Sequence, residues 1–356
     1  MIPRRKTRQV SVADVKIGGD APISVQSMTT PKTEDVEAVV AEINRLEEVG
    51  CEIVRITVPD DKAVDGFAEI RRRVKVPLVA DIHFNYRMAL RAIEAGADKI
   101  RINPGNIGSV ERVGAVLKAA KERGIPIRIG VNSGSVEREL LEKYGYPSPE
   151  AMVESAIRNV EICQDFGFDD IVISVKASDV PTMIQCYQML SEKVDFPLHL
   201  GVTEAGLKEK GSIKSSIGIG TLLYQGIGDT IRVSLTEDPV DEVKVGFEIL
   251  KSLGLRNYGV NVVACPTCGR IEVDLISIVS KVEEQLEKYK EKNLTVSILG
   301  CAVNGPGEAR EADIGLAFGK GSALVYKKGV KERMIHEDEV IDYLVGELEN
   351  WPENNC

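Results

Sequence analysis

The chain has little that would direct it into a membrane or out of a cell. No apolar run in its 356 residues approaches the roughly 18 residues that a membrane-spanning helix needs. The N-terminal segment Met-Ile-Pro-Arg-Arg-Lys-Thr-Arg is basic, but no apolar stretch follows it, so no signal peptide is expected. Low-complexity stretches are also absent. With 43% hydrophobic and 28% charged residues, a folded globular protein is expected.

Positive charge is also in deficit. The formal net charge is −10, which argues against nucleic acid as the main partner but leaves local basic pockets open. The seven cysteines are an odd number in a chain with no export signal, so we expect reduced thiols and a cytoplasmic protein. Four of them have no ligand-like spacing, and the first three of these are expected to be core residues: Cys51, Cys163, Cys186 and Cys356.

The remaining three cysteines form an incomplete metal-binding set. Cys265 and Cys268 lie in Ala-Cys-Pro-Thr-Cys-Gly-Arg, and Cys301 lies in Gly-Cys-Ala-Val-Asn-Gly-Pro-Gly-Glu, which ends at Glu308. The first motif alone fits a zinc knuckle, a redox dithiol or an iron–sulfur site. A structural zinc site usually has four Cys or His ligands, and a dithiol would not need Cys301. A 4Fe–4S cluster with one hard or exchangeable ligand fits best. Glu308 can supply that ligand, although a solvated loop acid fits its spacing equally.

A repeated helix–strand unit fills residues 20–253. The strands are apolar nearly throughout, as buried parallel strands are. Eight such units match a TIM (β/α)8 barrel in number and size, with an open doubly wound sheet as the alternative. Residues 10–19 are predicted to form a hairpin that plugs the barrel floor. The eight predicted strands span residues 23–29, 52–58, 77–84, 99–104, 126–132, 170–176, 197–203 and 230–236.

The pattern changes after Gly254. We predict a barrel domain at residues 1–254 and a smaller α+β domain, bearing the cysteines, at residues 259–356. The smaller domain is expected to contain helices near 275–291 and 338–349 and strands at 294–299 and 313–318.

Four predicted strands carry an arginine between two aliphatic residues. Because side chains alternate along a strand, the aliphatic residues should pack under the helices while the arginines point into the lumen. Cations gathered in one cavity need an anion, and arginine favours phosphate oxygens, so a diphosphate is predicted. An internal network with Asp81 and Glu204 is the alternative. The predicted binding residues are Arg55, Asp81, Arg101, Asn103, Arg128, Asn132, Lys176, Ser178, Arg232 and Ser234.

Three further residues are candidates for proton transfer. Glu204, at the end of the seventh predicted strand, is the first choice because an acid among phosphates can have an altered pKa. His83 and His199 follow, since both are expected at the barrel mouth. Hydrogen-bonded histidines of the lumen fit their positions equally well.

Taken together, the motifs resemble the bacterial two-domain hydroxymethylbutenyl diphosphate synthases, enzymes of the methylerythritol phosphate route to isoprenoids. The resemblance spans nearly the whole chain, and the two cysteine motifs are its most specific part. The motifs begin at Ser24 (SVQSMT), Ala80 (ADIHFN), Ile102 (INPGN), Leu200 (LGVTEA), Cys265 (CPTCG) and Gly300 (GCAVNGPGE).

This resemblance implies a reductive ring opening and dehydration. The substrate would be 2-C-methyl-D-erythritol 2,4-cyclodiphosphate, and the product (E)-4-hydroxy-3-methylbut-2-enyl diphosphate. A 4Fe–4S cluster would be ligated by Cys265, Cys268, Cys301 and Glu308, with ferredoxin or flavodoxin as electron donor. The alternatives are a non-catalytic iron–sulfur sensor on a barrel scaffold and a pterin-binding barrel enzyme with an accessory metal domain.

The short connection between the domains predicts a homodimer. A last barrel helix of about 14 residues would be about 21 Å long and would run from the mouth to the floor. Five linker residues reach at most about 17 Å. We therefore expect a head-to-tail pair in which each cluster domain caps its partner's barrel.

Overall fold

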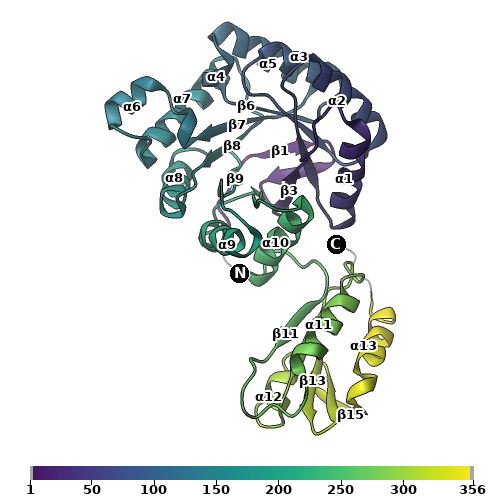
Figure 1. Ribbon diagram of the computed structural model, residues 1–356. Coiled ribbons are helices and arrows are strands. Elements are labelled where there is room, and N and C mark those ends of the chain that lie inside the picture. Colours follow the sequence, from purple (N-terminus) through teal and green to yellow (C-terminus); the bar gives the residue numbers. More distant parts are fainter. Residues whose placement is uncertain (1–2, 353–356) are drawn as a thin grey trace. The chain divides into compact units, whose positions relative to one another are not determined.

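The computed structural model describes residues 3–352, so Cys356 lies outside the described residues. The chain forms two compact units, residues 1–256 and 257–356, which are described separately below (Figure 1). None of the helices among the described residues is long and apolar enough to cross a membrane.

The first unit is a TIM barrel, as predicted. Its eight parallel strands run in the order β8-β7-β6-β5-β4-β3-β10-β9, and a bridge between Ile173 and Leu198 joins the two end strands. The strands are β3 (Ser24–Met28), β4 (Ile53–Thr57), β5 (Leu78–Asp81), β6 (Lys99–Ile102), β7 (Ile127–Asn132), β8 (Ile171–Lys176), β9 (His199–Leu200) and β10 (Thr230–Ile231).

Helices surround the strands in Figure 1. Many begin at an acidic or hydroxyl N-cap; Asp60, Ser148 and Asp179, for example, accept backbone N–H bonds at helix starts. The helices are α1 (Val36–Glu48), α2 (Asp61–Arg73), α3 (Tyr86–Glu94), α4 (Pro104–Ile107), α5 (Val110–Arg123), α6 (Arg138–Tyr144), α7 (Pro149–Asp165), α8 (Val180–Lys193), α9 (Lys208–Tyr224) and α10 (Pro239–Ser252).

A hairpin closes the floor of the barrel. Strands β1 (Gln9–Val12) and β2 (Val15–Gly18) pair antiparallel. The hairpin's apolar side chains form one buried cluster with barrel residues from the lower lumen. This cluster comprises Val10, Val12, Ile17, Ile53, Val79 and Val172. The predicted plug is thus present, and it is held by apolar burial.

The second unit is built on a five-stranded sheet in the order β11-β12-β13-β14-β15. The strands are β11 (Asn261–Ala264), β12 (Thr295–Leu299), β13 (Ile314–Gly319), β14 (Ser322–Lys327) and β15 (Val330–His336). Helices α11 (Leu275–Leu286), α12 (Gly305–Ala309) and α13 (Val340–Glu349) complete it. The unit has its own core, which includes Leu286, Val296, Phe318 and Leu344. Together with the barrel, this α+β unit confirms the predicted fold class.

Candidate functional site

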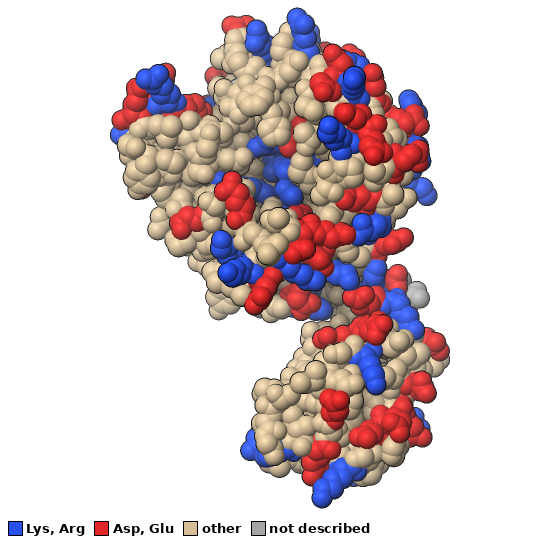
Figure 2. Space-filling view, viewed as in Figure 1, with Lys and Arg blue, Asp and Glu red and all other residues tan. Residues whose placement is uncertain are grey.

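The arginines alternate into the lumen as the sequence pattern predicts. Ile100 and Ile102 are fully buried on the helix side of β6, while Arg101 between them reaches Asp81 on β5. Lys and Arg side chains gather in a hollow of the barrel face seen in Figure 2. The predicted cations at this mouth are Arg55, Arg101, Arg128, Lys176 and Arg232.

Asp81 organises two of these cations. Its Oδ1 accepts a hydrogen bond from Arg101 Nη1 at 3.1 Å, and its Oδ2 lies 3.5 Å from Arg55 Nε. Burial raises the pKa of this carboxyl, but the two guanidinium groups outweigh burial and hold the pKa at about 2. Asp81 is therefore ionised, and it orients Arg55 and Arg101 in advance of any ligand.

Among the described residues, no carboxylate forms an ion pair with Arg128 or Lys176. Arg128 donates to Ser174 Oγ at 3.2 Å, but its Nε and Nη2 atoms have no partner among the described residues. Burial and the neighbouring arginines lower the pKa of both Arg128 and Lys176. Buried cations without counter-charge are costly, so the lumen favours an anionic ligand.

Two glycines leave space for the side chains of two of these cations. A Cβ on Gly130 would lie 2.5 Å from Arg101 Nε, and a Cβ on Gly201 would lie 2.6 Å from Lys176 Nζ. Any side chain at either position would displace the cation beside it. The bare backbone at these two places is therefore part of the site.

The alternative of an internal charge network is realised only in part. Asp81 pairs with two arginines, and Arg232 Nη2 lies 3.4 Å from both carboxylate oxygens of Glu242 on α10. Among the described residues, the ion pairs of the mouth do not involve Glu204. Two carboxylates thus face five predicted cations, and positive charge remains in excess.

The predicted polar residues occupy the strand ends. Asn103 is buried and accepts from Gly105 N–H at 3.1 Å, which leaves its Nδ2 without a partner in the described structure. Asn132 caps a short 3-10 turn, Ser133–Ser135. Ser234 Oγ is buried and unpaired among the described residues, whereas Ser178 is exposed. All four lie where the carboxyl ends of barrel strands carry ligand-binding groups.

Glu204 has an unusual backbone. It is exposed just beyond β9 and has φ = +55°, in the left-handed region that residues other than glycine seldom adopt. Such strain is found at functional sites more often than elsewhere. His83 is also exposed, with its Nε2 3.5 Å from Arg101 Nη1.

His199 lies deeper than its expected position at the mouth. It is the first residue of β9, fully buried, and its register partner Thr230 starts β10. Its Nδ1 is 3.4 Å from Thr230 Oγ1. Burial and nearby cations hold the pKa of His199 well below its usual value. A neutral, enclosed imidazole is a structural group of the lower lumen, which corrects the expectation that it shares the mouth.

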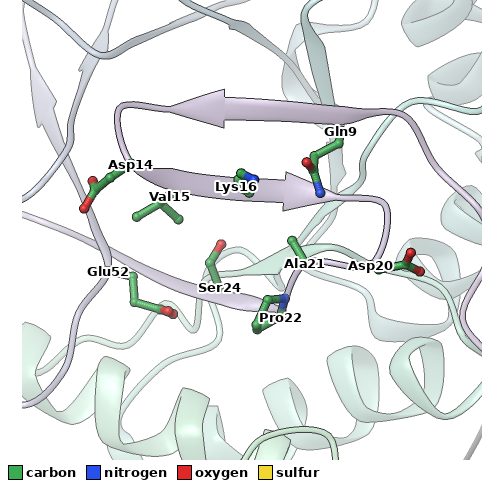
Figure 3. Close-up of a pocket in the computed structure, with 9 residues that line it drawn as sticks. All are labelled: Gln9, Asp14, Val15, Lys16, Asp20, Ala21, Pro22, Ser24 and Glu52. Carbon is green, nitrogen blue, oxygen red and sulfur yellow. The ribbon is translucent and has the colours of Figure 1, made fainter. Parts of the chain in front are cut away.

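A second hollow lies outside the barrel floor. It has a volume of about 490 Å³ and is bordered by the hairpin, the Asp20–Pro22 loop, Ser24 and Glu52 (Figure 3). Glu52 is already engaged by Val25 N–H and Arg256. This hollow is shallow and open, and it contains neither the arginines nor the cysteines.

In the second unit, the two cysteine-bearing segments follow neighbouring parallel strands, at the carboxyl end of each. Strands β11 and β12 are parallel neighbours, and Cys265 follows β11 while Cys301 follows β12. Gly300 N–H donates to Cys265 Sγ at 3.2 Å. Backbone N–H groups of Val303 and Asn304 lower the pKa of the Cys301 thiol. Cys268 is exposed beyond the end of β11.

Glu308 lies in α12, which begins four residues after Cys301. The helix packs through Ala309 into a small cluster that Cys265 also contacts. Within residues 3–352, no three His, Cys, Asp or Glu side chains converge closely enough to hold a metal ion. Even so, the three thiols and one carboxylate of these two segments are a donor set whose chemistry fits an iron–sulfur cluster.

Sequence reasoning missed Glu242 and Lys99. Glu242 is buried on α10, where a helical acid gives no signal of its contact with Arg232. Lys99 had a signal, because it has the same strand parity as Arg101 and Asn103.

The fold and the site together define a TIM barrel with an excess of buried cations in its lumen and a separate thiol-bearing unit. The GcpE TIM-barrel domain matches residues 7–247, and the GcpE protein C-terminal domain matches residues 261–350. The chain therefore belongs to the GcpE family.

The sequences of curated relatives align with this chain over nearly its full length. A protein of Shouchella clausii is 56% identical over 354 residues, covering 99% of this chain and 96% of the relative. One from Caldanaerobacter subterraneus subsp. tengcongensis is 57% identical over 350 residues, covering 98% of each. Both are named 4-hydroxy-3-methylbut-2-en-1-yl diphosphate synthase (flavodoxin).

Solved structures share the barrel fold alone. A type I 3-dehydroquinate dehydratase of Clostridium difficile has a TM-score of 0.52 at 14% identity, covering 70% of this chain and 100% of that one. The dihydropteroate synthase of Yersinia pestis has a TM-score of 0.50 at 15% identity, covering 69% and 97%. At these identities nothing about a pterin substrate carries over.

Proposed function

We propose that the chain catalyses the reaction for which its relatives are named, with flavodoxin as electron donor. The substrate is 2-C-methyl-D-erythritol 2,4-cyclodiphosphate. The ring is opened reductively, water is lost, and 4-hydroxy-3-methylbut-2-enyl diphosphate is formed. The observation that carries this proposal is the excess of buried cations at the barrel mouth, in a chain whose Cys265 and Cys301 follow two neighbouring strands of the second unit.

The cations provide the diphosphate site. Arg55 and Arg101 are held ready by Asp81, and Arg128 has two nitrogens without a hydrogen-bond partner among the described residues. When the ring opens, negative charge develops on the phosphate oxygen that leaves carbon. Fixed cations around that oxygen stabilise this charge more than the charge of the closed ring, which lowers the barrier.

Loss of water needs a proton at the departing hydroxyl group. Glu204 is the residue that we propose for this transfer, because its strained backbone holds a carboxyl at the carboxyl end of a barrel strand. His83, which lies beside Arg101, is the second choice and would help to orient the substrate.

The ligands proposed for a 4Fe–4S cluster are Cys265, Cys268, Cys301 and Glu308. When bound, the cluster would supply electrons to the substrate one at a time. Glu308 is exposed on a five-residue helix, so its carboxylate has freedom to approach or withdraw.

A head-to-tail homodimer would supply each barrel with a second copy's cysteine edge. Helix α10 has 14 residues and ends on the floor side of the barrel. Just beyond it, Arg256 Nη1 donates to Ile23 O at 2.9 Å, next to the start of β3. The chain thus leaves the barrel at its floor, whereas the substrate site is at its mouth.

Anaerobic purification with iron and sulfide analysis tests the cofactor. About four of each per chain, with turnover of the cyclodiphosphate by reduced flavodoxin, is expected. Zinc without sulfide would overturn the proposal, and a cluster without turnover would favour a sensor.

Mixing two inactive variants tests the dimer. Arg128→Met disables the barrel site, and Cys301→Ser disables the cluster site. If sites form between chains, mixed dimers contain one intact pair and activity returns. Each variant alone is the control, and a mixture that stays inactive after subunit exchange contradicts the head-to-tail arrangement.

A further inference from the structure

Lys99 lies at the base of the barrel lumen, below the cations of the mouth. It is the first residue of β6, two residues before Arg101, so both side chains face the lumen. Its register partner on β5 is Val79, which belongs to the apolar cluster of the hairpin plug. Lys99 is fully buried, with 0% of its surface exposed. Its amine therefore lies between an apolar floor and a layer of guanidinium groups.

No negative charge accompanies this amine. Lys99 Nζ has no hydrogen-bond partner among the described residues. The charges that act on it are Arg128 and Arg55, which have the same sign as an ammonium group. The floor hairpin contributes only apolar side chains to the cluster beneath it.

The other charged groups of the lumen do not compensate. Asp81 on β5 is engaged by two arginines, and Glu242 from α10 is engaged by Arg232. Lys176 on β8 and His199 on β9 add no negative charge. Burial and like charges together favour the neutral amine, and the pKa of Lys99 lies well below its usual value.

We propose that Lys99 is an electrostatic positioning residue of the substrate site, which takes up a proton from solvent when the cyclic diphosphate binds above it. The amine gains the proton and becomes an ammonium group, and no electron moves. The inference rests on the proposed function, because it needs a multiply charged anion at the mouth. Once that anion offsets the field of Arg128 and Arg55, the ammonium form becomes favourable.

This arrangement has an advantage for the free protein. A neutral amine does not add a further uncompensated charge to the buried cations while the mouth is empty of anion. The amine of Lys99 becomes positively charged only when an anionic ligand is bound above it. Arg128, with two unpaired nitrogens between Lys99 and the mouth, is the group through which Lys99 would act.

Calorimetry of substrate binding tests the proposal. The cyclodiphosphate is titrated into the cluster-loaded enzyme without reductant, near pH 8, in two buffers of different ionisation enthalpy. Each phosphorus of this ligand carries one ester and one anhydride bond, so its single remaining hydroxyl group does not titrate near neutral pH. The buffer dependence therefore reports protons taken up by the protein. The wild type is expected to take up protons, and Lys99→Met measurably fewer.

Lys99→Met replaces a buried, unpaired amine with an apolar side chain of similar length, so it should fold. Lys281→Met, at an exposed position on α11, is the matched control and should leave uptake unchanged. Lys176 contributes equally in all three proteins, so the difference isolates Lys99.

The pH dependence of the wild-type Kd gives a second measure. Because binding takes up a proton, Kd should rise as the pH rises above the pKa of Lys99 in the free protein. Absence of proton uptake by the wild type, equal uptake by Lys99→Met, or a Kd that is constant from pH 7 to 9 would overturn the proposal. Failure of the wild type to bind the cyclodiphosphate at all would instead count against the proposed function.

Discussion

Arg101 donates a hydrogen bond to Asp81 at 3.1 Å, and both side chains are buried in the lumen of the barrel. The same carboxylate lies 3.5 Å from Arg55, so one acid orients two cations. Preorganised charge of this kind stabilises a transition state without reorganisation at the moment of reaction. Asp81 is therefore expected to support both the fold and the proposed substrate site.

Replacing Asp81 by Asn should destabilise the barrel. The change leaves two buried guanidinium groups without their counter-ion, which costs about 3 kcal/mol of unfolding free energy. Denaturant unfolding of the chain measures this loss. The matched control is Asp169→Asn, which removes an exposed ion pair with Arg8 and should cost less than about 1 kcal/mol. Equal losses in both variants would contradict the role of Asp81.

Asp81 also predicts a specific acid sensitivity. Burial raises its pKa, but Arg55 and Arg101 hold the pKa at about 2, against an ordinary value of 3.8. A depressed carboxyl pKa stabilises the fold above the unfolded-state value, and that stability is lost as the pH falls through the folded-state value. The contribution is roughly 2 kcal/mol, lost between about pH 4 and pH 2. Unfolding free energies measured against pH should show a shallower fall over this window in Asp81→Asn than in the wild type.

Gly130→Ala should impair substrate binding without unfolding the chain. Its new Cβ would meet Arg101 Nε at 2.5 Å and push the guanidinium group from its place. We expect KM to rise by roughly tenfold or more, as misplacement of a charged contact does. Gly220→Ala on α9, whose Cβ would meet nothing within 4 Å, should leave the kinetics unchanged. A normal KM in Gly130→Ala would show that Arg101 does not contact the substrate.

Single replacement of Cys265, Cys268 or Cys301 by Ser should remove the cluster. A cluster with two protein thiolates is poorly held, so iron and sulfide content should fall well below the wild-type value. Cys163→Ala, which changes a buried cysteine on α7, is the control and should retain both. Full iron and sulfide in any of the three Ser variants would remove that cysteine from the ligand set.

Glu204→Gln should lower kcat by about 100-fold or more while KM changes little, because it removes a proton donor and keeps the side-chain volume. Glu204→Gly should also be inactive but more stable by about 1 kcal/mol, since glycine adopts φ = +55° without strain. Steady-state kinetics and thermal unfolding measure the two effects. Full turnover by Glu204→Gln would exclude Glu204 as the proton donor.

Much of the barrel could be predicted because the sequence shows which strand residues are aliphatic and face the helices, and which are polar and face the lumen. An arginine between two fully buried isoleucines, as at Arg101, must face the lumen, because the isoleucines face the helices. The cysteine edge was harder to foresee, because it depends on the parallel pairing of β11 with β12, and β11 has no clear strand signal.

Other features depend on tertiary context. Glu242 reaches Arg232 from a helix, so this contact follows from packing rather than from local pattern. His199 is deeper than expected because it is the first residue of β9, at the amino end of the strand, where it pairs in register with Thr230. β14 and β15 lie in a Lys-rich part of the chain; Ala323 and Val325 pack β14 on the unit's core, whereas most of β15 is exposed.

The apolar hairpin closes the floor end of the barrel, which leaves the mouth as the route into the lumen. Ligands cannot pass the cluster that includes Val12, Ile53 and Val172, so substrate enters and product leaves by the same route. Ring opening leaves a linear diphosphate with more negative charge than the ring, which the same cations hold more firmly. The exit of product is therefore expected to be a slow, salt-sensitive stage of the cycle, and linear diphosphates should compete with the substrate for entry.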